Sequence, residues 1–463
     1  MPKPRKHNKR LVADDGARAT LARMVTSQEI SSVVRAILFA ESREVWRGVV
    51  ATPPASLLEV VLAEFLRATP VAAELPFMST ICLVAQYLCE KGAALVMEDG
   101  RKVQPDFYTV LLAPSGEMKS FSQSRVLEGF ELGGWKPSRI RDAGSTAGLM
   151  EELRANEGKA TFWWIEEFGQ FWKQTVSEAH QGTPRLLLMA YDHATLTKCL
   201  RDSVLEVKDP CLSLLGTTVF ANLHNQLTKE DWASGLCQRI AFVFCSPDPT
   251  RNCFDRRYAI LDGVSLEKIA NAFRKATETP VHTNYRFTAD ARSAIGDSWV
   301  LMGRQGISAD FVRRIEFRAF KYALVYHWLL GKANNEIDKE DVNWAVRLAM
   351  LHLSDLRRIM DDVEYAELQD LMRRAEGLRL KFGKELAPRH LLMYLHRQLK
   401  TMPAAEALYS LLLDKEKAAL AGGKASPLLS DCAVAITVAN NTAASPTGNA
   451  PPGDARRPTW GAG

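Results

Sequence analysis

The sequence of 463 residues has no long apolar run of the kind that crosses a membrane. No segment reaches the roughly 18 consecutive apolar residues that such a helix needs, and the basic start is not followed by the apolar stretch of a signal peptide. Paired cysteines are also missing, because the eight cysteines are scattered without a Cys-x-x-Cys motif. We therefore expect a cytoplasmic protein without a zinc site or a disulfide framework.

Histidine clusters and nucleophile arrangements are missing as well. His180, His193, His224 and His327 lack the spacing of metal ligands, and no Ser/His/Asp or Cys/His pattern predicts a nucleophile. Apolar residues make up 47% of the chain and charged residues 24%, which indicates a globular protein with a sizeable core rather than a disordered one.

The net charge of +5 is unevenly spread, because the first eleven residues, MPKPRKHNKRL, are rich in Lys and Arg. Such an arm can contact the phosphate backbone of a nucleic acid. A solvated tail without a partner is the alternative that this composition leaves open.

Hydrophobic periodicity predicts an α/β core with a largely parallel, buried sheet. Apolar runs at 109–113, 161–165, 211–218 and 240–245 are typical of buried strands, and stretches such as 184–200 have helical spacing. We predict a basic arm (1–50), a helical lead-in (51–100), an α/β core domain (101–255), an all-helical lid (256–378), a winged-helix or helix-turn-helix remnant (379–420) and a disordered tail (421–463).

The segment from Ala113 to Ser120, APSGEMKS, is similar to the phosphate-binding pattern GxxxxGK[ST]. In that pattern backbone N–H groups face the phosphates, a Lys reaches the β- and γ-phosphates and a hydroxyl binds Mg²⁺. Ala113 and Met118 stand where the pattern has glycine, and Met118 is expected to weaken binding because the backbone there approaches phosphate or is strained. The candidate nucleotide-binding residues are Ser115, Gly116, Glu117, Met118, Lys119 and Ser120.

Two carboxylates follow the strand predicted at 161–165. Glu166 and Glu167 would emerge at the end of that strand, where the first carboxylate of such a pair holds the water shell of Mg²⁺ and the second polarises the attacking water. We expect Ser120 and Glu166 to bind the metal and Glu167 to act as general base. A solvated acidic pair at the start of a helix is the alternative.

Three further residues are candidates by their positions along the chain. Thr217, slightly favoured over Thr218 at the end of the apolar run 211–218, would orient water or sense the γ-phosphate, although a strand-ending turn with Thr is also common as structure alone. Arg239, expected to face outward at the end of a helix, would enter a neighbouring subunit's site. Arg313 would fold back on the nucleotide as a lid sensor, although a solvent-exposed charge paired with Glu316 fits equally well.

The order of six blocks resembles a family of helicase-like P-loop ATPases of the AAA+ type, a domain of unknown function carried by phages, plasmids and integrated islands. The blocks are LLAPSGEMKS, GSTAGLMEEL, FWWIEEFGQFW, LLLMAYDHATLTKCLRDS, CLSLLGTTVFANLHNQL and GLCQRIAFVF. The resemblance covers roughly residues 55–360. Members usually have glycine where Met118 stands and Asp where Glu166 stands.

This resemblance implies an ATP- and Mg²⁺-dependent function in the replication of a mobile genetic element. The expected activity is DNA unwinding or remodelling by a homo-oligomeric ring, with single-stranded DNA favoured over duplex and a primase as a replication partner. A slow or non-hydrolysing DNA-binding scaffold, an initiator or a loader with the same fold is the alternative.

Overall fold

The computed structural model describes residues 51–141, 145–175, 180, 182–199, 204–224, 226–227, 231–232, 235–245, 261–303, 309–396, 399 and 401–420. The predicted basic arm and disordered tail lie outside these residues. The chain divides into two compact units, and the division falls at Arg357 and Arg358, inside helix α16 (Lys339–Phe382). Among the described residues, no helix is both long and apolar enough to cross a membrane.

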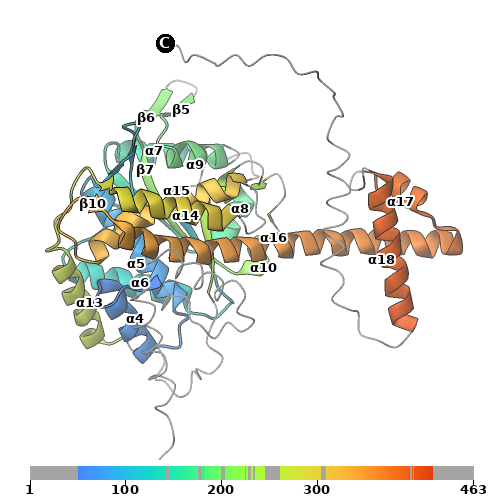
Figure 1. Ribbon diagram of the computed structural model, residues 1–463, viewed down its shortest axis with the longest axis horizontal. Helices are drawn as coiled ribbons and strands as arrows, with labels where there is room; N and C mark the ends of the chain where they lie inside the picture. The colour runs from blue at the N-terminus through green and yellow to red at the C-terminus, as the bar shows by residue number, and fades with distance from the viewer. Residues whose placement is uncertain are drawn as a thin grey trace, which may run out of the picture. The chain divides into compact units, whose positions relative to one another are not determined.

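The first unit contains a four-stranded parallel sheet (Figure 1), which confirms the predicted α/β core. The sheet order is β4-β7-β3-β8, and nearly every strand residue is buried, as in sheets covered on both faces. The four strands are β3 (Tyr108–Leu112), β4 (Ala160–Ile165), β7 (Cys211–Thr218) and β8 (Ile240–Phe244).

Residues 138–140 pair in parallel with the free edge of β4. The Ile140 N–H donates to the Phe162 carbonyl over 3.0 Å, and the Phe162 N–H donates to the Ser138 carbonyl over 2.8 Å. The Arg139 guanidinium lies 5.0 Å from the centroid of the Trp164 ring on β4. This edge of the sheet is therefore covered rather than left open to another chain.

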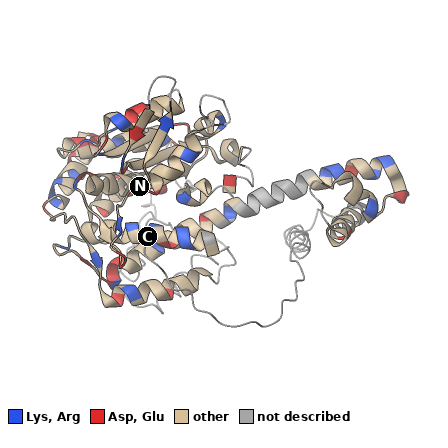
Figure 2. Ribbon diagram, turned by 90° about the horizontal axis from the view of Figure 1, so that it is seen from above, with Lys and Arg blue, Asp and Glu red and all other residues tan. Residues whose placement is uncertain are grey.

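The region predicted as a lid (256–378) is mostly helical where it is described, and its part up to Arg357 belongs to the first unit. Lys321 on α15 (Ala309–Leu329) places its Nζ 2.8 Å from the Asp106 carboxylate, just before β3, and both side chains are fully buried. Burial alone would raise the pKa of the Asp106 carboxyl, but the charges of Lys321 and His193 hold it below its usual value, so the acid is ionised. Acidic and basic residues are interspersed along the elements of this unit (Figure 2).

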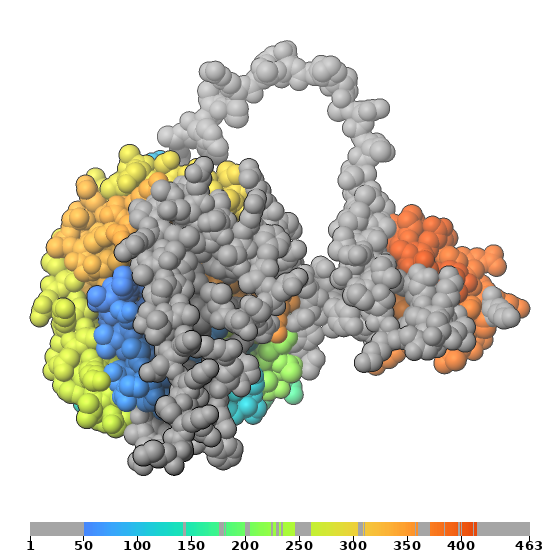
Figure 3. All heavy atoms as spheres, turned by 60° about the horizontal axis from the view of Figure 1, so that its bottom comes forward, coloured from blue at the N-terminus to red at the C-terminus, as the bar shows by residue number. Residues whose placement is uncertain are grey.

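The predicted helical lead-in also packs onto this unit. Helix α5 (Glu74–Glu90) crosses β3, β4 and β7 and is buried at almost every position, which explains why it is apolar on all sides. Helix α4 (Leu57–Ala68) lies beside α13 (Gly263–Ala276) (Figure 3), and Glu64 accepts from Lys268 over 2.9 Å between them. The α13 helix packs in turn on α6 (Lys119–Leu132).

One prediction within the core is wrong. The stretch 184–200 is not a single helix, because α9 (Thr183–Tyr191) ends before His193, which has a left-handed φ of 53°, and the chain continues as strand β5 (Leu196–Cys199). Threonines within this stretch favour a strand over a helix. Strand β5 forms an antiparallel hairpin with β6 (Val204–Val207).

The remaining elements of the first unit are short helices, small strand pairs and α14. They are β1 (Leu95–Val96), β2 (Lys102–Val103), α7 (Thr146–Ala155), α8 (Phe168–Gln174), α10 (Phe220–His224), α12 (Leu236–Arg239), β9 (Arg286–Phe287), α14 (Ala289–Gly303) and β10 (Glu336–Ile337).

The second unit is a small helical bundle made by the end of α16 and by η1 (Gly383–Glu385), α17 (Pro388–Tyr394) and α18 (Met402–Leu420). It has its own apolar core, which includes Leu391, Leu408 and Leu412. The described residues of the region predicted as a winged-helix or helix-turn-helix remnant (379–420) are mostly helical and include no strand that could form a wing.

Candidate functional site

The loop between β3 and α6 contains two residues in the left-handed region. Gly116 has a φ of +88°, and Met118 has a φ of 50° and a ψ of 40°. Glycine adopts this conformation freely, whereas a Cβ makes it costly at Met118. The strained backbone that the sequence predicted at Met118 is therefore confirmed. The start of the loop is fixed to the sheet, because the Ala113 N–H donates to the Thr218 carbonyl over 3.1 Å.

Helix α6 begins at Lys119 without a side-chain cap and without an acidic residue in its first turn. Its N-terminus therefore presents backbone N–H groups and the positive end of the helix dipole. The Lys119 ammonium folds back over the loop and donates to the Pro114 carbonyl over 3.1 Å, and Ser120 is exposed on the first turn. These groups suit an anion with several oxygens.

Glu117 is the one acid within this loop, and it is half-buried. Burial raises the pKa of its carboxyl, and the nearby Lys119 charge opposes that rise. A carboxylate here opposes phosphate binding electrostatically, and the Lys119 charge beside it offsets part of that repulsion.

The predicted acidic pair lies in the turn directly after β4. Glu166 and Glu167 are exposed, and Glu167 precedes the first residue of α8. The Thr217 hydroxyl, at the end of β7, donates to the Glu166 carbonyl over 2.6 Å. The Thr218 hydroxyl accepts from the Gly169 N–H over 3.2 Å. Both hydroxyls therefore hold the acidic turn against the end of β7.

The loop and the acidic turn lie at the same edge of the sheet, because parallel strands end on the same side. One strand, β7, separates β3 from β4, so the two sites are about 10 Å apart across the sheet. That spacing accommodates a phosphate group and its metal ion. The structure thus brings together the candidate residues of the loop, the acidic turn and Thr217.

Arg239 does not face outward, so that expectation is wrong. Its side chain is 7% exposed, and its Nε and Nη2 atoms donate to the Asp192 carboxylate over 3.2 and 2.5 Å. A third donation, to the Gly235 carbonyl, satisfies Nη1. Helix α12 leads into the first residue of β8, so Arg239 lies at the edge of the sheet opposite the loop. Asp192 lies within the block LLLMAYDHATLTKCLRDS, but nothing in the sequence indicated that it pairs with Arg239.

Arg313 is also distant from the loop of its own chain. The same stretch of α15 contacts α12, since Arg318 donates to the Gln238 carbonyl over 3.2 Å and Arg314 lies 3.8 Å from the Asp192 carboxylate. Arg313 itself is exposed. This position differs from the lid sensor that we expected, because α15 reaches the starts of the strands rather than their ends.

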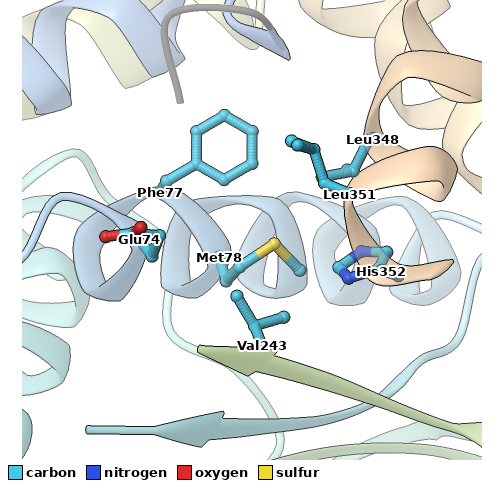
Figure 4. A pocket seen from close by; sticks show the side chains of 7 residues that line it. All are labelled: Glu74, Phe77, Met78, Val243, Leu348, Leu351 and His352. Carbon is cyan, nitrogen blue, oxygen red and sulfur yellow. The ribbon is translucent and has the colours of Figure 1, made fainter. Parts of the chain in front are cut away.

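A small apolar cavity lies elsewhere in the first unit, between α5, β8 and α16 (Figure 4). Its walls include Phe77 and Met78 of α5, Val243 of β8 and Leu351 of α16. A volume of about 10 Å³ has room for a single water molecule at most. This cavity is therefore too small for a nucleotide.

The described residues contain no group of three or more His, Cys, Asp or Glu side chains that could hold a metal ion. A magnesium site of the predicted kind does not need such a group, because Mg²⁺ retains waters and takes few protein ligands when a phosphate also binds it. The donors at this edge, the Ser120 hydroxyl and the Glu166 carboxylate, are both exposed and are oxygen ligands.

A comparison of the chain with family models finds no match, and a comparison with curated proteins finds no significant one. The functional assignment therefore rests on the residues and their arrangement.

Proposed function

We propose that the chain is an ATPase that acts on DNA, with its nucleotide site at the loop between β3 and α6. The observation that carries the proposal is the strand order β4-β7-β3, which brings an uncapped helix N-terminus and an exposed acidic turn to one edge of a parallel sheet. A loop that can bind phosphate and a pair of carboxylates are the two parts that nucleotide hydrolysis requires.

Each part has a role in this proposal. The backbone of residues 115–118 and the first turn of α6 would hold the phosphates, and Lys119 would leave the Pro114 carbonyl to reach them. Ser120 and Glu166 would hold Mg²⁺, which neutralises phosphate charge when bound. Glu167 would accept a proton from the attacking water, and Thr217 would keep the acidic turn in position.

The partner in this proposal is single-stranded DNA, and the context is replication of a mobile genetic element. The support is the order of the six sequence blocks, which resembles helicase-like ATPases. The resemblance also suggests a homo-oligomeric ring, and the buried Arg239, paired with Asp192 at the opposite edge of the sheet, is given no role in it. A primase is the replication partner that the resemblance suggests.

The test is ATP hydrolysis by the purified chain with and without single-stranded DNA. We expect Lys119→Ala to abolish turnover and Glu167→Gln to lower kcat by about 10²- to 10⁴-fold, because the general base is lost. Lys159→Ala and Glu151→Gln, exposed residues outside the loop and the acidic turn, are the matched controls and should behave as wild type. Wild-type turnover no higher than that of Lys119→Ala would refute ATP hydrolysis at this site.

A second candidate function is a DNA-binding scaffold, initiator or loader that hydrolyses ATP slowly or not at all. Met118 favours it, because a residue with a Cβ occupies a left-handed position beside the phosphate-binding groups. Wild type that binds ATP and DNA without turnover would support this second function over the first.

A further inference from the structure

The second unit carries a stack of aromatic rings beside a lysine. The rings of Phe382 and His390 are parallel within 2°, with centroids 5.2 Å apart, and the Tyr394 ring lies 5.5 Å from Phe382. The Lys381 ammonium is 5.5 Å from the centroids of both Phe382 and Tyr394. We refer to Lys381, Phe382, His390 and Tyr394 as the aromatic-basic cluster.

The aromatic-basic cluster is accessible to a ligand. Tyr394 is 45% exposed, and two further apolar side chains of this unit, Met393 and Leu380, are 58% and 89% exposed. The core of the unit is filled mostly by leucines and alanines, and Phe382 packs against it, whereas Tyr394 is not one of its buried residues. The Tyr394 ring is therefore held beside Phe382 and remains open to a ligand.

The segment that contains the cluster is basic in sequence. Residues 371–400 contain eight Lys or Arg and two Asp or Glu, a net charge of +6, which exceeds the net charge of +5 for the whole chain. Figure 2 shows Lys and Arg along the last turns of α16 and at α17. Such a density of positive charge attracts a phosphate backbone.

Local hydrogen bonds hold the cluster in place before any ligand binds. The His390 Nδ1 accepts from the Ala387 N–H over 3.1 Å, so the neutral ring carries its proton on Nε2, which remains able to donate. Arg379 donates to the Gly383 carbonyl over 2.9 Å and fixes the start of the turn between α16 and α17. A pre-organised surface loses little conformational entropy on binding.

We propose that the aromatic-basic cluster is a binding site for single-stranded nucleic acid. Unpaired bases stack on the Tyr394 ring and on its stacked neighbours, while Lys381 and Arg389 contact the phosphates. Recognition of duplex DNA through its major groove is disfavoured, because α17 has only seven residues. It exposes the apolar Met393 and the Tyr394 ring rather than groups that could hydrogen-bond to base edges. The choice of DNA as ligand rests on the proposed function, but binding here needs no ATP.

The test is fluorescence anisotropy of the full chain, without nucleotide, against labelled oligo(dT) about 20 nucleotides long, with a hairpin duplex beside it. We expect Tyr394→Ala to weaken binding to oligo(dT) by at least about fivefold and Tyr394→Phe, which keeps the ring, to restore it. Lys381→Gln should reduce the slope of log K against log salt by about 0.7, the share of one phosphate contact. Lys275→Ala, the same loss of charge on α13 in the first unit, should leave affinity and slope unchanged.

Three results would overturn the proposal. They are wild type without affinity for oligo(dT), wild-type affinity in Tyr394→Ala with its folding verified by circular dichroism, and equal losses for duplex and oligo(dT) in that variant. A change in sedimentation of Tyr394→Ala at unaltered DNA affinity would instead identify the surface as a contact between copies of the chain. Because no nucleotide is present, failure of ATP hydrolysis and failure of this site are separate outcomes.

Discussion

Replacing Met118 by glycine should stabilise the first unit. Met118 has a φ of 50° and a ψ of 40°, and this left-handed conformation costs a residue other than glycine about 1–2 kcal/mol. Glycine removes that cost but gives the unfolded chain more freedom, which offsets about 0.5–1 kcal/mol. The free energy of unfolding should therefore rise by about 0.5–1 kcal/mol in Met118→Gly.

The same substitution should strengthen nucleotide binding. Without the Cβ and the thioether chain, the backbone N–H groups at the start of α6 can approach phosphate more closely. We expect the Kd for an ATP analogue to fall several-fold, about the factor of 5 to which 1 kcal/mol corresponds. Met118→Ala is the matched control, because it removes the long side chain but retains the Cβ and the cost of the left-handed backbone.

The measurements are urea unfolding and titration of a fluorescent ATP analogue in the presence of Mg²⁺. A gain in affinity by the glycine variant alone would show that the Cβ and the strained backbone at position 118 hinder binding. An equal gain by the alanine variant would show that the thioether side chain hinders it. A glycine variant that is less stable than wild type and binds nucleotide no better would refute both the strain at Met118 and its position beside a phosphate site.

Three further predictions concern the first unit. Lys321→Met should lower the free energy of unfolding by about 3–5 kcal/mol in urea titrations, because the fully buried Asp106 loses its ammonium partner. A smaller loss in the double variant Lys321→Met, Asp106→Leu would show that the uncompensated charge is the cause. Thr217→Val should cost about 1 kcal/mol and lower kcat more than it raises KM, since the hydrogen bond to the Glu166 carbonyl is lost, and Thr217→Ser should restore both. Burial raises the pKa of Glu316 to about 7. Between the ordinary pKa of Glu and about 7, the folded chain therefore keeps this proton while the unfolded chain releases it. The free energy of unfolding of wild type should fall as the pH rises through this range. Glu316 is partly exposed, so this loss of stability is on the order of 1 kcal/mol. Unfolding compared at about pH 5 and pH 8 should show the loss in wild type and not in Glu316→Gln. Identical pH dependence of the two chains would contradict the prediction.

The parallel sheet could be predicted because each of its strands is a short apolar run of its own. The run 161–165 ends in two glutamates, and 211–218 ends in two threonines, so the polar ends of the strands were visible in the sequence. Parallel strands that end at one edge then place these residues near the loop at 113–118. The pattern within a single apolar run was therefore sufficient to predict a strand and the polar residues at its end.

The parts that could not be predicted depend on contacts between distant residues. The burial of Arg239 is caused by Asp192, 47 positions earlier, and neither residue has a local signal that reveals the other. The division of α16 at Arg358 was likewise hidden, because the helix continues through it without a change in periodicity. The hairpin of β5 and β6 was missed because its first strand matches helical spacing.

The buried pair of Asp106 and Lys321 has a consequence for the order in which the chain acquires its structure during synthesis. Asp106 is synthesised 215 residues before Lys321, its ion-pair partner. The hydrogen bond from the Tyr326 hydroxyl to the Ala51 carbonyl joins residues that are 275 positions apart. Strand β3 and its loop therefore cannot reach their final environment until α15 has emerged, and the first unit matures late and as a whole. A chain released near residue 255 would contain the loop, the acidic turn and Thr217, and would still leave the Asp106 carboxylate, just before the start of β3, without its ammonium partner.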